Sequence, residues 1–187
     1  NPSVVNTMQY ITIATVGNFT DFGDLTDGRE SLAASSSLTR SIFSGGADPG
    51  KSNIIDYVTT ATTGDAADFG DITAARTALA AFGSSIRGVI GGGDTGSISD
   101  VIDYVTIAST GDATDFGDLT QARTEVAGAS TKTRGVFVGG QVGGSPYVRY
   151  NIIDYVTIAS TGDAADFGDM TTGLNQVTAV SDSHGGL

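Results

Sequence analysis

One phrase recurs four times along the 187-residue chain and constrains its fold more than any other feature. It reads "DYVTIASTGDAADFGDMT" at 154–171 and returns with small changes from Asp103, from Asp56 and from Gln9. The tyrosines that mark it are spaced by 47, 47 and 51 residues: Tyr10, Tyr57, Tyr104 and Tyr155. A fixed period of about 20–50 residues is typical of solenoids, propellers and other repeat arrays. We therefore expect one small unit, used several times.

Each unit is expected to contain four short strands. "NIIDYVTIAST" is rich in Ile, Val, Tyr and Thr, which favour strands, and it ends at a Thr-Gly-Asp turn. A short segment with one Phe follows, then a run of small residues such as "LAASSS", then an apolar strand closed by a Gly pair, as in "RSIFSGG". No segment keeps an apolar period of 3.6 residues over three turns, which argues against helices. Four strands in about 40–50 residues predict an all-β fold made of propeller blades.

The four phrases predict a single domain over residues 1–187. Its repeat units lie at about 8–53, 54–100, 101–151 and 152–187. The chain opens in a third strand at 8–14 and finishes just after a first strand at 177–182, so we expect four blades, the last closed by both termini. The missing strand of that blade would be abbreviated to 184–187. The alternative is a piece of a longer propeller, and a start at Asn1 instead of Met favours a processed or partial chain.

The order of features resembles the kelch repeat over almost the whole chain. An apolar strand ends in Gly-Gly, and an Asp-Tyr pair, an aromatic residue and an Arg follow. The sets read Gly45-Gly46, Asp56-Tyr57, Phe69, Arg76; Gly92-Gly93, Asp103-Tyr104, Phe116, Arg123; and Gly139-Gly140, Asp154-Tyr155, Phe167. The resemblance implies four-stranded, kelch-like blades. Two features depart from the kelch pattern: Phe stands where kelch units usually carry Trp, and the Asp precedes the Tyr.

The acidic composition excludes several functional classes. The formal net charge is −12 and the isoelectric point is about 4.1, so no basic stripe exists to neutralise nucleic acid or an anionic membrane surface. With no Cys and one His, the chain lacks the usual ligands of zinc, copper and haem. No apolar run approaches the roughly 20 residues of a membrane span. We expect no nucleic-acid partner, no membrane insertion and no cofactor.

Repeated aspartates are the most prominent candidates for a metal site. They follow the pattern Asp-x-x-Asp-x-x-Asp: Asp65, Asp68, Asp71; Asp112, Asp115, Asp118; and Asp163, Asp166, Asp169. Clustered carboxylates suit Ca²⁺, which takes six to eight oxygen ligands. Side chains three positions apart in a strand point to opposite faces, however, so the three cannot all converge. Turn-forming, solubilising Asp residues are the favoured interpretation, and Ca²⁺ binding is the alternative.

Two sets of arginines repeat with the units. One set follows each Phe by seven residues: Arg29, Arg76 and Arg123. The other precedes each second strand: Arg40, Arg87 and Arg134. The first set is expected to pair with blade carboxylates or to cap carbonyls between blades, and the second set is likewise expected to be structural. The alternative, a convergent anion-binding ring as in sialidases, is already broken by Leu174 at the fourth equivalent position.

No residue is predicted to be catalytic. His184 lies beside Ser and Asp, but neighbours in sequence do not make a triad, and a capping role at the chain end is favoured. A pair of catalytic carboxylates for glycoside hydrolysis would be expected at positions that differ between the repeat units, whereas these Asp residues recur at the same positions from unit to unit. The protein is therefore expected to be non-enzymatic.

Function is instead expected where the repeat is violated. The loop after each Gly pair varies, and the third copy, "QVGGSPYVRYN", holds a four-residue insertion. This loop carries Tyr147, Arg149 and Tyr150, and Tyr and Arg are frequent anchors of recognition surfaces. These three residues are the predicted contacts with a ligand or partner. The alternative is a longer turn whose tyrosines pack on a neighbouring blade or subunit.

The phrase "IDYVTIASTGDATDFGDL", together with "TRGVFVGG" and "SDSHGGL", resembles repeat segments in structural proteins of marine cyanophages and similar tailed phages. This resemblance implies an extracellular virion protein, in a tail, fibre or particle-surface propeller. Its partners would be other virion proteins or further copies, with host-surface polysaccharide as a candidate ligand. Two alternatives remain open: a propeller glycoside hydrolase or lyase acting on host polysaccharide, and a secreted bacterial adhesion or filament module.

Overall fold

The protein is built from antiparallel sheets without helices in the part described, residues 4–143 and 146–181 of a computed structural model. Three of the sheets have four strands each. They are β3 (Ala33–Ser36), β4 (Arg40–Ser44), β5 (Ile54–Thr59) and β6 (Ala67–Asp71); β7 (Ala80–Gly83), β8 (Arg87–Gly91), β9 (Val101–Thr106) and β10 (Thr114–Asp118); and β11 (Ala127–Ser130), β12 (Arg134–Val138), β15 (Ile152–Thr157) and β16 (Ala165–Asp169). The predicted all-β class is confirmed, and so are the four strands of each complete unit. No helix able to cross a membrane occurs among these residues.

Two smaller sheets complete the described structure. β1 (Thr7–Tyr10) pairs with β2 (Thr20–Asp24), which correspond to the third and fourth strands of a unit. β13 (Gln141–Val142) pairs with β14 (Val148–Arg149) to make a hairpin within the third four-stranded sheet's variable loop. The other two units have no hairpin here, only short turns closed by isolated bridges such as Ala47 with Lys51. Within residues 4–143 and 146–181, the insertion therefore produces a hairpin that only the third unit has.

The apolar core lies between neighbouring sheets. Ile42 and Ile55 of the first four-stranded sheet pack with Ile90 and Val105 of the second, and all four are buried. A second cluster joins the next two sheets, where the rings of Phe82 and Phe137 have centroids 4.7 Å apart. Burying one such side chain stabilises the fold by about 1.5–3 kcal/mol. The interfaces between sheets thus supply the apolar stabilisation that no single unit has by itself.

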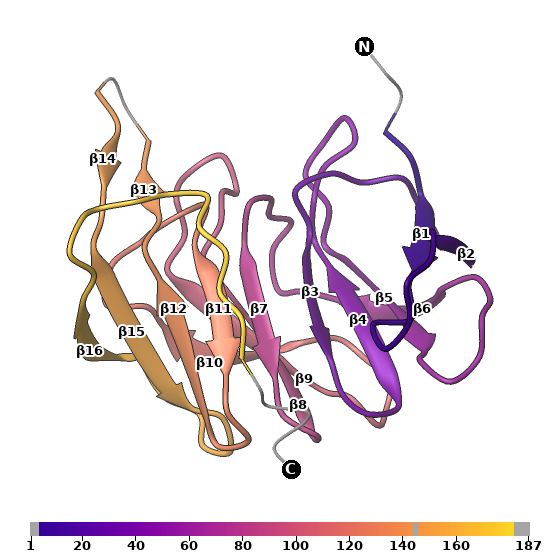
Figure 1. Cartoon of the computed structure of the whole chain (residues 1–187). Helices are drawn as coiled ribbons and strands as arrows, with labels where there is room; N and C mark the ends of the chain where they lie inside the picture. Colours follow the sequence, from indigo (N-terminus) through magenta and orange to yellow (C-terminus); the bar gives the residue numbers. More distant parts are fainter. Residues whose placement is uncertain (1–3, 144–145, 182–187) are drawn as a thin grey trace.

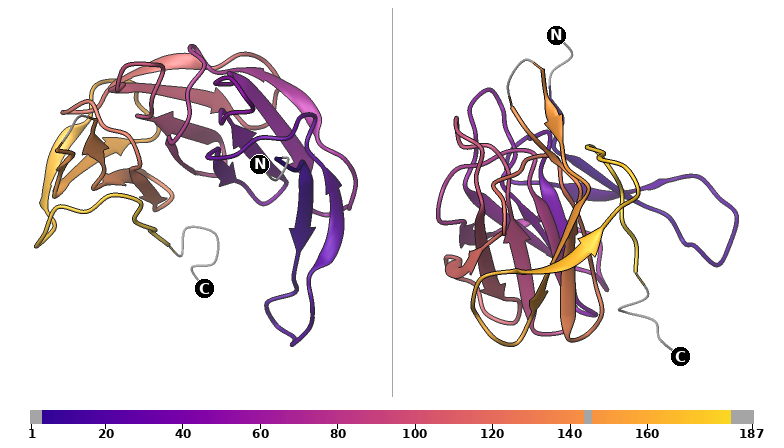
Figure 2. Two further views of the ribbon diagram at one scale, coloured as in Figure 1. Left: turned by 90° about the horizontal axis from the view of Figure 1, so that it is seen from above. Right: turned by 90° about the vertical axis from the view of Figure 1, so that its left-hand side faces the viewer.

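Neighbouring sheets follow one another around an arc (Figures 1 and 2), and β3, β7 and β11 lie side by side on its concave side. The residues just before these strands are linked in series, because Ala78 N donates to Ser31 O (2.9 Å), Glu125 N to Ala78 O (2.9 Å) and Gln176 N to Glu125 O (3.1 Å). The four residues of this series, Ser31, Ala78, Glu125 and Gln176, adopt the left-handed backbone conformation, with φ between 53° and 57°. Gln176 continues this series, so the run at 177–181 occupies the position of a further first strand although it carries no strand of its own.

The expected blade shared by both termini is not formed by the described residues. β1 and β2 pair only with each other, and residues 172–181 belong to no sheet. Seen from above, the arc is open and its two ends stand apart (Figure 2). The same backbone hydrogen bonds recur at each interface between sheets, but the described part of the chain does not bring the two ends of the array together. Residues 184–187, expected to supply the missing strand, lie outside the described residues.

Candidate functional site

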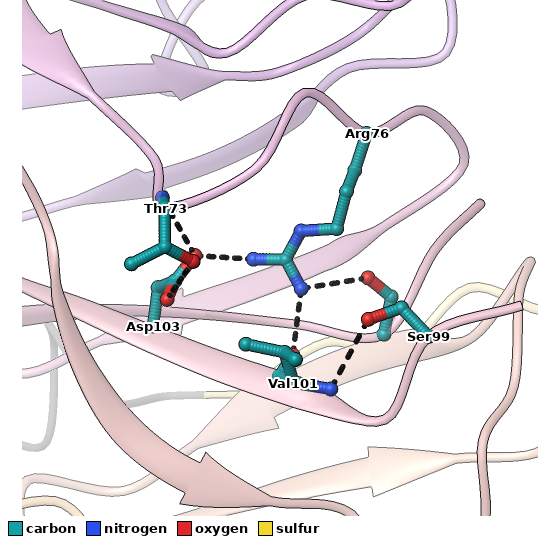
Figure 3. A network of polar contacts seen from close by, with 6 residues as sticks. Thr73, Arg76, Ser99, Val101 and Asp103 are labelled. Carbon is teal, nitrogen blue, oxygen red and sulfur yellow. Dashed lines mark hydrogen bonds and ion pairs between the residues drawn. The ribbon is translucent and has the colours of Figure 1, made fainter. Parts of the chain in front are cut away.

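A buried aspartate forms the centre of a polar site that recurs at each interface between sheets. Asp103 in β9 is fully buried and belongs to the second four-stranded sheet. Its partners come from the segment that links the first of those sheets to the second: Thr73 Oγ1 donates to Asp103 Oδ1 (2.8 Å), and Arg76 Nη2 donates to Asp103 Oδ2. Figure 3 shows this arrangement, with the guanidinium between the carboxylate and the backbone of Val101. The carboxylate therefore ties one sheet to the end of the previous one.

The guanidinium of Arg76 is held by backbone carbonyls as well. Arg76 Nη1 donates to Val101 O (2.7 Å) and to Gly92 O (3.2 Å). Arg123 repeats the pattern at the next interface, donating to Asp154 Oδ2 (2.6 Å), Gly139 O (2.9 Å) and Ile152 O (3.0 Å). Both predicted structural roles, pairing with a carboxylate and capping carbonyls, are confirmed for these two arginines.

The first interface has a looser version of the site. Arg29 Nη1 lies 3.0 Å from Asp56 Oδ2, which makes an ion pair, but the guanidinium donates no hydrogen bond within residues 4–143 and 146–181. Thr26 Oγ1 still donates to Asp56 Oδ1 (2.6 Å). Buried N–H groups without an acceptor each cost about 1–3 kcal/mol. Among the described residues, the polar site next to β1 and β2 is therefore the one with the fewest satisfied donors of the three.

The acid–base properties of the site follow from its burial. Burial raises the pKa of Asp103, while the charge of Arg76 and the hydrogen bonds from Thr73 oppose that shift. Burial likewise lowers the pKa of Arg76, and Asp103 opposes it. Each charge is costly without its partner, so the two groups depend on each other. The Asp103 carboxylate, fully buried and bonded to Thr73 and Arg76, is thus committed to the contact between the two sheets.

The repeated acidic phrase also acts between sheets. Asp65 Oδ1 accepts from Asp24 N (3.0 Å), and the same bond joins Asp112 to Asp71 N (3.1 Å) and Asp163 to Asp118 N (3.1 Å). The first Asp of each triplet therefore binds the backbone of the preceding sheet, a role that the sequence did not indicate. Among residues 4–143 and 146–181, no three acidic or His side chains gather as a metal-binding group.

Acidic residues nevertheless lie close enough to influence one another. Burial raises the pKa of Asp118, and the charges of Asp100, Asp163 and Asp115 raise it further. This crowding is repulsive at neutral pH and marks the outer part of the interface between the second and third four-stranded sheets.

The second set of arginines stacks on the repeated tyrosines. The guanidinium carbons of Arg40, Arg87 and Arg134 lie 4.4–4.5 Å from the ring centroids of Tyr57, Tyr104 and Tyr155. Each Tyr in turn meets its Phe edge to face, as with Tyr104 and Phe116 at 5.9 Å. Arg40 Nη1 also donates to Ile107 O (2.9 Å), and Arg87 Nη1 to Ile158 O (2.9 Å), both in the following sheet. These arginines are structural, as predicted.

The predicted contact residues lie on and beside the β13–β14 hairpin. Tyr147 is 64% exposed, and Arg149 in β14 is exposed as well. Tyr150 is half-buried, and its backbone is bonded on both sides: its N–H donates to Gly140 O (2.9 Å) and its carbonyl accepts from Leu174 N (3.3 Å). Tyr147 and Arg149 are thus exposed to solvent, whereas Tyr150 is only partly so. His184 lies outside the described residues.

No protein-family model matches the chain, and no curated protein matches its sequence.

Proposed function

We propose that the protein is a non-enzymatic structural and binding module whose sheets are kelch-like propeller blades and whose recognition surface is the β13–β14 hairpin. One observation carries the proposal: Tyr147 and Arg149 are exposed at the single place where an insertion breaks the repeat. The other strongly patterned charges serve the interfaces between sheets, where Asp103 and Asp154 are buried and paired with arginines.

The chemistry of the hairpin suits a carbohydrate ligand. A Tyr ring stacks on the apolar face of a sugar, and an Arg donates several hydrogen bonds to hydroxyl or carboxylate oxygens. A single hairpin offers only a small contact area, so binding of one copy would be weak. Display of many copies on one particle would raise the overall affinity.

A place on the surface of a phage particle is supported by the resemblance of the repeat phrase to structural proteins of tailed phages. The acidic exterior, with a net charge of −12, keeps such a surface soluble. The ligand on this proposal is the polysaccharide coat of the host, and the location is the virion exterior.

The test measures binding of the whole chain to purified host-surface polysaccharide by calorimetry or glycan array. We expect Tyr147→Ala and Arg149→Ala each to weaken binding at least about tenfold. Lys132→Ala removes an exposed cation from the β11–β12 turn and is the matched control, expected to have little effect. Equal loss in all three variants, or no binding by the parent protein, would refute the hairpin as the recognition surface. Release of new reducing ends would indicate an enzyme instead.

A further inference from the structure

We propose that the two ends of the array bind each other between copies, so that a second copy of this chain docks head to tail. In this contact β1, β2 and the loop at 11–19 of one copy pack on β15 and β16 of the next. The proposal concerns assembly and is independent of the carbohydrate ligand.

The interfaces inside the chain provide the template. At the second interface, the loop that follows β9 lies on β6 of the preceding sheet, where Gly111 N donates to Phe69 O (2.7 Å) and Ala113 N to Asp71 O (2.8 Å). The interfaces on either side repeat both bonds, from Gly64 N and Ala66 N and from Gly162 N and Ala164 N. A Cβ on Gly70 would lie 2.5 Å from the carbonyl carbon of Gly111, so only glycine permits this approach. One geometry therefore serves three successive contacts.

In the part of the chain that the structure describes, nothing covers the half of this contact that lies at the C-terminal end of the array. Phe167 is 55% exposed, whereas its equivalents Phe69 and Phe116 are 2% exposed beneath the following sheet. Beside it lies a groove of about 540 Å³ lined by Arg134, Val136, Phe167 and Ser181, among others. A Cβ on Gly168 would meet nothing within 4 Å, where the equivalent Gly117 meets Gly162 of the next sheet.

The N-terminal end presents the complementary half. Ile13 is 97% exposed, whereas its equivalents Ile107 and Ile158 are 1% exposed against the preceding sheet. Val16 and Phe19 in the same loop are also exposed. Gly17 stands at the position of Gly111, with open space around it. Asn18 stands at the position of Asp112 and keeps a side-chain oxygen that can accept from a backbone N–H.

The charged residues change in step at the two ends. Leu174 replaces the arginine equivalent to Arg76, and Gln9 replaces the aspartate equivalent to Asp103. In the template geometry these two positions meet, and a lone Arg or a lone Asp there would be a buried charge without a partner. Their joint neutrality is what a contact between the two ends requires. Arg134 is already stacked on Tyr155 and stands where it would donate to Ile13 O of the second copy, as Arg87 does to Ile158 O.

A second copy is the occupant that fits, because the two ends of one arc stand apart (Figure 2). A contact that joins two different faces is heterologous and closes into a ring or grows into a filament. Continuity with three internal interfaces supplies the geometry, and the apolar side chains of both ends supply the driving force.

Cross-linking of single-cysteine variants tests the contact, since the chain has no cysteine of its own. Asn18→Cys and Asp169→Cys are mixed and treated with a short bis-maleimide. Covalent dimers are expected in the mixture and not with either variant alone. The pair Asp118→Cys and Asp163→Cys in one chain is the internal control for reach, because these residues are joined across an existing interface. Absence of cross-links in the mixture, with the control intact, would overturn the proposal. So would a cross-link that forms only within a chain carrying both Asn18→Cys and Asp169→Cys.

A charge-restoring cycle tests the register of the same contact. Sedimentation velocity of the parent chain should show reversible association. Leu174→Arg and Gln9→Asp should each weaken it at least tenfold, and the double variant should recover most of that loss by re-forming the internal ion pair. Additive losses in the double variant, or a parent chain that stays monomeric at all concentrations, would overturn the proposal.

Discussion

Replacing Arg76 by Leu is the sharpest test of the claim that buried ion pairs hold the sheets together. The substitution leaves the Asp103 carboxylate fully buried, with Thr73 as its remaining donor. Removing one partner of a buried pair typically costs about 3–5 kcal/mol. A domain of this kind is stable by about 5–15 kcal/mol in total, so the variant should lose a large part of its stability. Leu already stands at the equivalent position 174, so the side chain itself is compatible with the repeat.

Urea unfolding measures the loss, followed by far-ultraviolet circular dichroism and Tyr fluorescence. Lys51→Met is the matched control, because Lys51 and Asp94 form an ion pair with the same kind of geometry (3.0 Å) but remain 28% and 36% exposed. Exposed pairs contribute about 0–1 kcal/mol. The double variant Arg76→Leu/Asp103→Gln carries the Leu and Gln found at positions 174 and 9, and it should be more stable than Arg76→Leu alone.

The pH dependence provides a second readout of the same variant. Burial already raises the pKa of Asp103, and loss of Arg76 removes the main opposing charge, so the pKa rises further. A folded-state pKa above the unfolded value means that the native state binds the proton more tightly. The cost of Arg76→Leu should therefore be greatest at neutral pH and shrink as the pH falls through the raised pKa. A cost at neutral pH no greater than that of Lys51→Met would refute the reasoning.

Two further substitutions test the backbone features of the array. Gly117→Ala should destabilise the fold by at least about 2 kcal/mol, because φ is 142° and the new Cβ would lie 2.5 Å from the Gly162 carbonyl carbon. Gly162→Ala is the control, because φ is similar there (149°) but the space around a Cβ is open. Equal losses of stability in the two variants would contradict the close-contact argument. Ala78→Gly should raise the midpoint of urea unfolding, because φ is 55° and glycine relieves about 1 kcal/mol of backbone strain there. Ala81→Gly in β7 is the control and should lower the midpoint. A lower midpoint for Ala78→Gly than for Ala81→Gly would contradict the strain argument.

The periodic sequence determined the local structure of this protein. Each unit contains strand-forming runs of Ile, Val, Tyr and Thr and turns at Gly-Asp, and the units follow one another at spacings of 47, 47 and 51 residues. These local features were enough to predict the all-β class and the four-strand unit. The structural role of Arg76 and Arg123 was predicted because both residues recur at the same position of the repeat. The insertion that forms the β13–β14 hairpin was visible because it breaks that period.

Tertiary structure alone decided which groups meet and whether the array closes. Thr73 donates a hydrogen bond to Asp103, which is 30 residues away in the next sheet, and Asp112 accepts one from the backbone N–H of Asp71 in the previous sheet. Closure depends on the rotation between sheets, which is set by contacts such as that of Gly70 with Gly111. The rotation at each interface adds to the next along the array, and no single residue determines the sum. The count of phrases therefore suggested a closed ring, whereas residues 4–143 and 146–181 form an open arc (Figure 2).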